Sequence, residues 1–255
     1  MITPCLNAWA TIERTLESVA AQDHPDIEHV VVDGGSDDGT VALLEDAGVR
    51  YVSEPDRGLS DAMNKGIAMA TGEAIGWLNA DDFYLPEALS TAAASFAAFP
   101  DAEWVTAPCL IVDEHDAEIR KAVTAYKRAL LRRYSRRSLL VQNFVAAPAT
   151  FVRTDVLRAV GGFDERFRYS MDYDVWLKLA QRGDPAVVDQ PLTAFRMAKG
   201  SLSMSGFERQ FAEHAQNARE HGDGHRVAVA ANQAMSRAIV LVYKAMRARR
   251  ERRAG

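Results

Sequence analysis

Residues 27–40 read IEHVVVDGGSDDGT, a run of aliphatic side chains that ends in an acidic, glycine-rich turn. The arrangement returns at residues 74–82, AIGWLNADD, where a second apolar run ends at two adjacent carboxylates. Short apolar runs bounded by turn residues are typical of buried strands, so we predict strands at 27–32 and 74–78. Ligands of parallel sheets bind beyond the carboxyl ends of the strands, and the two acidic turns are therefore where we expect the chemistry.

Amphipathic segments lie between these runs. Their apolar residues repeat at helical spacing, in one segment at Trp9, Ile12, Leu16, Val19 and Ala20, and in another at Leu59, Ala62, Met63, Ile67 and Ala70. Residues 50–52 and 1–3 read as further strands, and the second of these is very short for a strand at the centre of a sheet. The alternation of strands and helices predicts an α/β fold with a mostly parallel sheet flanked by helices.

The second half of the chain has a looser pattern. Residues 104–112 and 149–152 read as strands, and a helical stretch follows Asp172 and Asp174. From Phe207 onward the pattern predicts two helices broken at Gly222-Asp223-Gly224. No internal repeat or low-complexity linker is present, so we expect one compact domain with a helical C-terminal extension.

The composition excludes several classes of protein. The 255 residues are 48% hydrophobic and 25% charged, which disfavours disordered, collagen-like and coiled-coil chains. Two cysteines form no disulfide framework and favour a reducing compartment. The N-terminus does not resemble a signal peptide, and the aliphatic run Ile239–Val242 is far shorter than the roughly 20 residues of a membrane span. These features predict a cytoplasmic protein.

The net charge of −5 is unevenly distributed. No acidic residue occurs between Glu118 and Asp155, a window that holds nine basic residues: Arg120, Lys121, Lys127, Arg128, Arg132, Arg133, Arg136, Arg137 and Arg153. The last twelve residues carry +5, which leaves −19 for the rest of the chain. The protein is therefore an acidic body with two basic strips.

Three groups of carboxylates are candidates for chemistry. Asp81 and Asp82 repel each other and suit Mg²⁺ or Mn²⁺, although a solvated turn would also accept them. Asp33 either contacts a ligand or caps its own turn. Asp172 and Asp174 fall at a predicted helix start, where both could be caps or one could act as a general base.

Six segments in order carry a family resemblance. They are Thr3–Asn7 (TPCLN), Val32–Thr40 (VDGGSDDGT), Glu54–Gly66 (EPDRGLSDAMNKG), Gly72-Glu73, Leu78–Asp82 (LNADD), and Gly161–Glu165 (GGFDE) followed by Asp172–Trp176 (DYDVW). Over about residues 1–200 the chain resembles the family 2 glycosyltransferases, nucleotide-sugar enzymes of the GT-A fold. The resemblance implies a GT-A domain at 1–200, with a nucleotide-binding half at about 1–100 and an acceptor half at about 101–200. Residues 201–255 would form the helical extension and basic tail.

The resemblance also implies roles for individual residues. The donor nucleotide would be bound by residues of the strand-to-helix loops: Pro4, Asn7, Asp33, Glu54, Asp56, Asp61, Asn79 and Asp81. The family's DXD-type metal motif matches Asn79-Ala80-Asp81-Asp82, so that Asp81 and Asp82 are both candidate ligands of Mg²⁺ or Mn²⁺. The general base matches Asp172, whereas Asp174 and Trp176 match structural positions.

The implied reaction is an inverting, single-displacement transfer. One sugar of a nucleoside-diphosphate sugar would move to a hydroxyl of a glycan or lipid-linked acceptor, in cell-surface polysaccharide or glycolipid synthesis. The Gln-x-x-Arg-Trp motif of processive members is absent from the sequence, and Phe195–Met197 with Gly200–Ser203 matches the loop that closes over the donor in non-processive members. Two alternatives stay open: a sugar-nucleotide-binding protein with impaired catalysis, motivated by Asn79, and a nucleotidyltransferase.

The basic strips have two interpretations. They are solvated helix faces, or they bind an anionic membrane surface, which the interleaved Leu130, Leu131, Leu139 and Leu140 favour. No nucleic-acid-binding module is recognisable, so we expect no nucleic-acid partner. The membrane interpretation predicts a cytoplasmic protein held peripherally on the inner face of the cell membrane.

Overall fold

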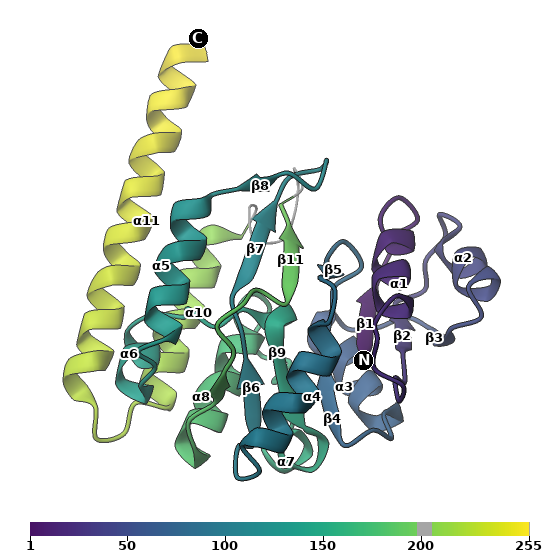
Figure 1. Cartoon of the computed structure of the whole chain (residues 1–255). Coiled ribbons are helices and arrows are strands. Elements are labelled where there is room, and N and C mark those ends of the chain that lie inside the picture. Colours follow the sequence, from purple (N-terminus) through teal and green to yellow (C-terminus); the bar gives the residue numbers. More distant parts are fainter. Residues whose placement is uncertain (198–205, 255) are drawn as a thin grey trace.

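The computed structural model describes residues 1–197 and 206–254, without the side chains of Phe207 and 245–254. An α/β body carries two long helices along one side (Figure 1). The strands are β1 (Ile2–Cys5), β2 (Val30–Asp33), β3 (Arg50–Ser53), β4 (Ala74–Gly76), β5 (Phe83–Tyr84), β6 (Trp104–Thr106), β7 (Cys109–Val112), β8 (Glu118–Ile119), β9 (Thr150–Arg153), β10 (Ala186–Val187) and β11 (Thr193–Arg196). The helices are α1 (Ile12–Ala20), α2 (Thr40–Asp46), α3 (Leu59–Met69), α4 (Ala88–Ala98), α5 (Lys121–Leu131), α6 (Arg136–Val141), the 3₁₀ helix η1 (Ala147–Ala149), α7 (Thr154–Ala159), α8 (Met171–Arg182), α10 (Phe207–Glu220) and α11 (Arg226–Ala254).

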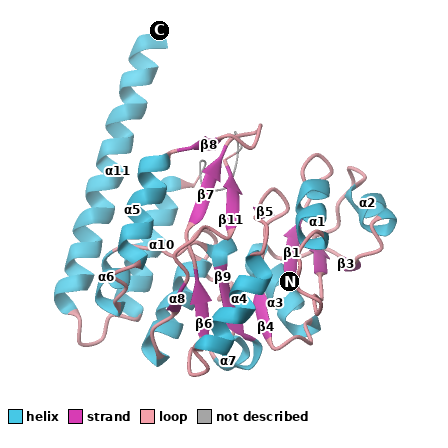
Figure 2. Ribbon diagram, in the orientation of Figure 1, coloured by secondary structure: helices cyan, strands magenta, loops and turns pink. Residues whose placement is uncertain are grey.

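The main sheet is built from two hydrogen-bonded groups of strands. β1, β2 and β3 pair in parallel, with Ile2 opposite Val30 and Val30 opposite Arg50. A parallel bridge between Ile2 and Trp77 continues the sheet into the order β4-β9-β6-β10. Only β9 in this series runs antiparallel to its neighbours, so the described strands confirm the predicted mostly parallel sheet. Helices cover the sheet, as the alternating pattern predicts (Figure 2).

The predicted strand at 104–112 is wrong as a single element. It is two strands, because β6 belongs to the main sheet whereas β7 pairs with β11 and β8 in a second sheet. Pro108 lies between them and has no N–H to donate to a continuous ladder. The break turns the chain toward the second sheet, which contains β5 and lies beside the main one (Figure 1).

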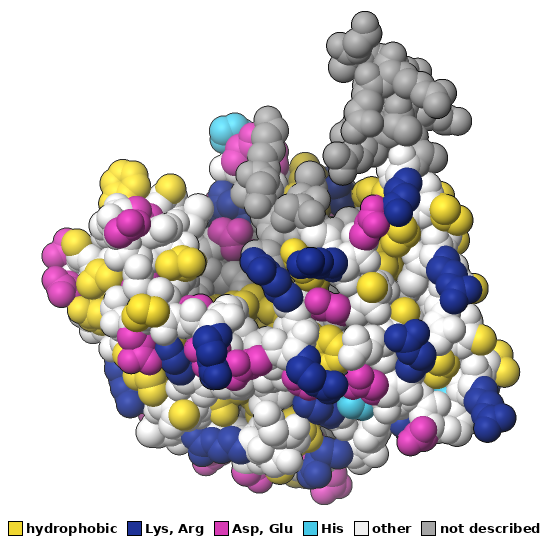
Figure 3. Space-filling view, turned by 180° about the vertical axis from the view of Figure 1, so that it is seen from behind, with side chains coloured by type: hydrophobic (Ala, Val, Ile, Leu, Met, Phe, Trp, Pro, Cys, Tyr) yellow, Lys and Arg dark blue, Asp and Glu magenta, His cyan; other side chains and the backbone are white. Residues whose placement is uncertain are grey.

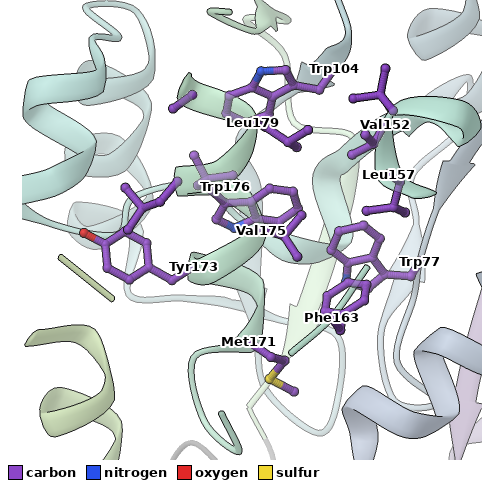
Figure 4. Close-up of a cluster of buried hydrophobic side chains, with 14 of the residues drawn as sticks. Trp77, Trp104, Val152, Leu157, Phe163, Met171, Tyr173, Val175, Trp176 and Leu179 are labelled. Atoms are coloured by element: carbon purple, nitrogen blue, oxygen red, sulfur yellow. The ribbon is translucent and has the colours of Figure 1, made fainter. Parts of the chain in front are cut away.

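Three tryptophans form the centre of the main core (Figure 4). Trp176 stacks on Trp77 and on Trp104, with ring centroids 5.2 and 5.9 Å apart, and Phe163 meets the Trp77 ring edge-on. Trp176 and Asp174 are 0% and 1% exposed, as their predicted structural role requires. Because α8 is buried on most of its surface, its first turn, which holds Asp172, is fixed in the body of the protein.

The C-terminal extension forms two adjacent helices, as predicted. α10 and α11 are joined at residues 221–225 and pack beside α6 and α8 (Figures 1 and 2). His221 Nε2 lies 2.7 Å from Asp174 Oδ1, and Glu213 Oε2 accepts hydrogen bonds from the backbone N–H groups of Tyr169 and Ser170. The extension therefore holds the segment that leads into α8.

Two interpretations of the sequence need correction. Trp9 precedes α1 and is 57% exposed, so it is not part of a buried helix face. Leu131, Leu139 and Leu140 are buried in the main core and only Leu130 is partly buried, which removes most of the apolar surface on which the membrane interpretation depended. The pattern misled because leucines beside arginines also occur on amphipathic helices that face a core. In the part of the chain that the structure describes, no helix is both long and apolar enough to cross a membrane.

Candidate active site

A pocket of about 560 Å³ opens between the end of β4, the inner face of α5 and the start of α8. Asn79 and Asp81 line it on one side, and Asp172 lines it from the first turn of α8. Its other polar and charged lining residues are Arg120, Thr124, Lys127, Asn143, Arg168, Tyr169, Gln210 and His214. The pocket thus brings together residues separated by more than a hundred positions in the sequence.

The two adjacent aspartates have different environments. Asp81 lines the pocket, where burial raises the pKa of its carboxyl and its nearest opposing charge is Arg196. Asp82 does not line the pocket and is 0% exposed. Its carboxylate accepts hydrogen bonds from the Arg196 backbone N–H at 2.9 Å and from Asn79 Nδ2 at 3.0 Å. Burial and the neighbouring Asp81 raise the pKa of Asp82 well above its ordinary value.

The pocket residues fit a divalent cation that is held jointly by the protein and a bound phosphate. Within the described residues, no group of three His, Cys, Asp or Glu side chains is arranged to hold a metal. Mg²⁺ needs no such cage, because it is commonly bound by one or two carboxylates together with substrate phosphates and water. Asp81, a half-buried carboxylate with no hydrogen-bonded side-chain partner among the described residues, matches that requirement.

Asp172 has the environment expected of a general base. Its Oδ1 accepts the Tyr173 backbone N–H at 2.8 Å, and the Asn143 side chain also hydrogen-bonds to it. Burial raises the pKa of Asp172, and the Lys127 ammonium acts in the opposite direction. A carboxylate with a raised pKa removes a proton from a hydroxyl more readily than an ordinary one.

Asp33 lies at the end of β2, outside this pocket, and is fully buried. Its carboxylate accepts hydrogen bonds from the backbone N–H groups of Gly35 and Ser36 at 3.1 and 2.9 Å, and from Ser53 Oγ at 2.6 Å. Burial disfavours its charge, but these hydrogen bonds outweigh that effect and hold the pKa of Asp33 below its ordinary value. Asp33 therefore shapes the turn that follows β2.

Three more of the predicted nucleotide-binding residues, Pro4, Asn7 and Asp56, lie in or just after β1 and β3, the strands on either side of β2. Pro4 is buried within β1, and Asn7 Oδ1 accepts the Asp37 N–H at 3.0 Å. Asp56 lies over Gly34, where a Cβ would come within 2.5 Å of Asp56 Oδ2. Glycine at position 34 thus makes room for this carboxylate.

Glu54 and Asp61 belong to a network of ion pairs. Asp61 lies 2.7 Å from Arg57, and Lys65 bridges Glu54 at 2.8 Å and Asp61 at 3.7 Å. The pocket around Asp81 and Asp172 includes neither of them. The predicted loop Gly200–Ser203 lies outside the described residues, whereas Phe195 and Met197 line the pocket.

Sequence reasoning missed the polar wall of the pocket. From the sequence, Arg120 and Lys127 count only as members of a basic strip. Together with Thr124 and Leu131 they lie three, four or seven residues apart on one face of α5 and its N-cap. That spacing was visible in the sequence. Asn143 and His214 gave no comparable signal, because they come from a loop and from the extension.

Comparison with known proteins identifies the family of this chain. Residues 1–161 match the model of glycosyl transferase family 2. The chain belongs to this family. A glycosyltransferase of Mycobacterium tuberculosis strain H37Rv is 32% identical to this family member over 203 residues, which are 76% of this chain and 73% of the relative.

This chain spans a smaller share of the length of other relatives. The PGL/p-HBAD biosynthesis glycosyltransferase of Mycobacterium bovis strain BCG is 29% identical, over 68% of this chain and 66% of the relative. A glycosyltransferase of Rickettsia typhi is 25% identical over 70% of this chain, which spans only 57% of that relative.

Solved glycosyltransferases share the GT-A fold of this chain. S. aureus TarS 1–349 in complex with UDP-GlcNAc superposes with a TM-score of 0.69 at 20% identity, covering 86% of this chain and 65% of TarS 1–349. The mannosyltransferase PcManGT of Pyrobaculum calidifontis, in complex with GDP-Man and Mn²⁺, superposes with a TM-score of 0.64 at 19% identity. The superposition covers 96% of this chain and 79% of PcManGT. At these identities the likeness concerns the fold.

Proposed function

We propose that this chain transfers one sugar from a nucleoside-diphosphate sugar to a hydroxyl acceptor, with inversion at the anomeric carbon. One observation carries the proposal: a single pocket is lined by Asp81, which suits a metal-bound diphosphate, and by Asp172, which suits a general base. The donors bound to TarS and PcManGT, UDP-GlcNAc and GDP-Man, support a sugar nucleotide as substrate.

The donor would extend along the carboxyl ends of the parallel strands. Asn7 and Asp56 would contact its nucleoside, on a turn held by Asp33. Asp81 would hold Mg²⁺ or Mn²⁺ with the diphosphate, and Asp82 would hold the Asn79 side chain in place through its hydrogen bond. When bound, the cation supplies Lewis-acid stabilisation of the charge on the departing diphosphate.

Asp172 would accept the proton of the attacking hydroxyl. Its raised pKa increases its basicity, while Lys127 and the hydrogen bond from the Tyr173 N–H keep the carboxylate ionised and in place. A base on the acceptor side permits direct displacement and therefore inversion. The activity should fall as the pH decreases through the raised pKa of Asp172.

The acceptor would be a glycan or a lipid-linked glycan. A relative named for PGL/p-HBAD biosynthesis supports a role in glycolipid or cell-surface polysaccharide synthesis.

Peripheral attachment to an anionic membrane is a separate part of the proposal. Leu241 and Val242 on α11 are 67% and 56% exposed, and Arg133 and Arg137 are exposed nearby in the sequence window without acids. In co-sedimentation with phosphatidylglycerol vesicles, the full chain should bind more than a chain truncated after Tyr243 that also carries Arg133→Gln and Arg137→Gln. Equal binding of the two chains would contradict attachment.

The decisive test of function compares Asp172→Asn with Asp189→Asn. Asp189 is exposed and pairs with Arg128 and Arg132, so its substitution makes the same chemical change away from the pocket. Release of nucleoside diphosphate from a panel of sugar nucleotides with Mn²⁺ should fall by about 10²–10⁴-fold in Asp172→Asn and stay within about twofold in Asp189→Asn.

Each alternative gives a different result in this assay. Turnover of Asp172→Asn equal to the wild type would contradict the proposed base. Binding of a sugar nucleotide without turnover by the wild type would indicate impaired catalysis, and release of pyrophosphate would indicate a nucleotidyltransferase.

A further inference from the structure

The part of the pocket lining that comes from α5 and from the segment before α8 holds three cations. One face of α5 supplies Arg120 and Lys127, and the segment before α8 supplies Arg168. The carboxylates of the pocket are Asp81 and Asp172, so the described lining has one more cationic than anionic side chain. On the face of the molecule drawn in Figure 3, basic and acidic side chains are intermixed.

None of these three cations has an ion-pair partner among the described residues, whereas three other cations of α5 do. Arg128 and Arg132, on the outer face of α5, both pair with Asp189, and Lys121 pairs with Glu118. Pocket cations without an ion-pair partner, beside cations of the same helix that are paired, indicate a place for an anion that the chain itself does not supply.

Polar atoms without partners lie in the same wall. Thr124 Oγ1, Asn143 Oδ1 and His214 Nε2 are buried side-chain atoms that make no hydrogen bond in the structure. Burial, followed by the charge of Lys127, lowers the pKa of His214 to about 4, so its ring is neutral at pH 7. Buried polar atoms are almost always hydrogen-bonded, and a ligand with both hydroxyls and anionic oxygens would satisfy all three.

We propose that Arg120, Lys127 and Arg168 bind a phosphate group carried by the acceptor, with Thr124, Asn143 and His214 contacting its sugar or phosphate oxygens. Lys127 interacts electrostatically with Asp172 and His214, whereas the opposing charge of Asp81 is Arg196. Lys127 therefore lies on the side of the base, and Arg168 comes from the segment that leads into the helix of Asp172. The inference rests on the proposed function, and it narrows the acceptor to a phosphorylated one, soluble or lipid-linked.

The first experiment measures binding to the full-length chain by isothermal titration calorimetry in EDTA, which removes any contribution of a divalent cation at Asp81. Glucose 1-phosphate should bind more tightly than methyl α-glucoside, its neutral counterpart. Arg120→Gln and Arg168→Gln should each weaken glucose 1-phosphate binding about tenfold, since a hydrogen bond to a charged group contributes about 1.5 kcal/mol. The matched variant Arg133→Gln/Arg137→Gln, outside the pocket, should bind as the wild type does.

Two results would overturn the proposal. One is equal binding of glucose 1-phosphate and methyl α-glucoside, and the other is an equal loss of affinity in Arg133→Gln/Arg137→Gln, which would reflect net charge alone. A short-chain polyprenyl phosphate, tested in the same way, separates the two sources of the phosphate: tighter binding than glucose 1-phosphate indicates a lipid-linked acceptor, and weaker binding a soluble one.

A final measurement tests whether these cations bind the acceptor or the donor. Binding of UDP and GDP with Mn²⁺ should be unchanged in Arg120→Gln/Arg168→Gln, and a loss as large as that for glucose 1-phosphate would assign the cations to the donor instead. Failure of every sugar nucleotide to bind the wild type would contradict the proposed function itself, whatever the result with glucose 1-phosphate.

Discussion

The turn after β2 and the pocket wall formed by α5, α8 and α10 both contain buried polar groups. The two regions differ in whether those groups have hydrogen-bond partners within the protein. In the turn, Asp33 accepts hydrogen bonds from backbone and hydroxyl donors, and Thr40 Oγ1 accepts the Ala8 N–H at 2.9 Å. In the wall, Thr124 Oγ1 and His214 Nε2 have no hydrogen-bond partner.

The difference separates structural from binding roles. A polar group that is fully hydrogen-bonded stabilises the fold, and its removal leaves its partners unsatisfied. A buried polar group without a partner costs stability and persists where a ligand uses it. Burial and charge alone would have classed both regions as functional sites, whereas their hydrogen bonds distinguish them.

The largest effect should come from replacing Asp33. Asp33→Ala removes the buried carboxylate that accepts hydrogen bonds from several part-buried N–H and O–H groups, and should lower the free energy of unfolding by about 3 kcal/mol. The matched substitution Asp81→Ala removes a carboxylate without hydrogen-bonded partners and should leave the free energy of unfolding unchanged or higher, while abolishing Mn²⁺-dependent donor binding. Urea titrations of both variants measure this difference. Equal destabilisation by the two substitutions would contradict the distinction between a structural and a binding carboxylate.

A pair of threonines tests the same contrast with a smaller chemical change. Thr40→Val and Thr124→Val each replace a buried hydroxyl by a methyl group of similar size. Thr40→Val should cost about 2 kcal/mol, because the Ala8 N–H and Asp38 lose their partner. Thr124→Val should change the free energy of unfolding by less than about 0.5 kcal/mol, and a larger loss would mean that its hydroxyl is satisfied after all.

Acid should destabilise the protein through buried histidines. Burial lowers the pKa of His29 from 6.5 to about 3, so the unfolded chain binds a proton that the folded chain excludes. The free energy of unfolding is therefore fully retained above about pH 6.5 and falls by up to about 1.4 kcal/mol per pH unit as the pH decreases toward 3. His29→Asn should flatten this slope in urea titrations at pH 7.5 and 5.5, and exposed His115→Asn should leave it unaltered.

The smallest effect is expected at the outer face of α5. Asp189→Asn breaks exposed ion pairs with Arg128 and Arg132, and should lower the free energy of unfolding by less than about 1 kcal/mol. The loss should shrink further in 0.5 M NaCl. A salt-independent loss above about 2 kcal/mol would show that the outer face contributes as much as the buried turn.

Much of the fold was predictable because its signals are local. The apolar runs ending at Asp33 and at Asn79 gave β2 and β4, and the glycines at 222 and 224 marked the junction of α10 and α11. The pairing of β6 and β7 with different sheets was not predictable, because the hydrophobic pattern of a strand does not indicate which strands it pairs with. Local amphipathicity likewise could not tell whether Leu139 and Leu140 face a core or a membrane.

The sequence by itself determined the order of strands and helices, the acidic turns at the strand ends and the family. These follow from hydrophobic periodicity and from motifs within a few residues of each other. Only the tertiary structure decided that Asp81 faces the pocket while Asp82 is buried and that Asp33 is already satisfied. It also decided that Lys127 and Asn143 act on Asp172, in a pocket that His214 lines as well. The physical reason is that hydrogen bonding and desolvation depend on which groups long-range packing brings together, and adjacent residues in a sequence can face opposite environments.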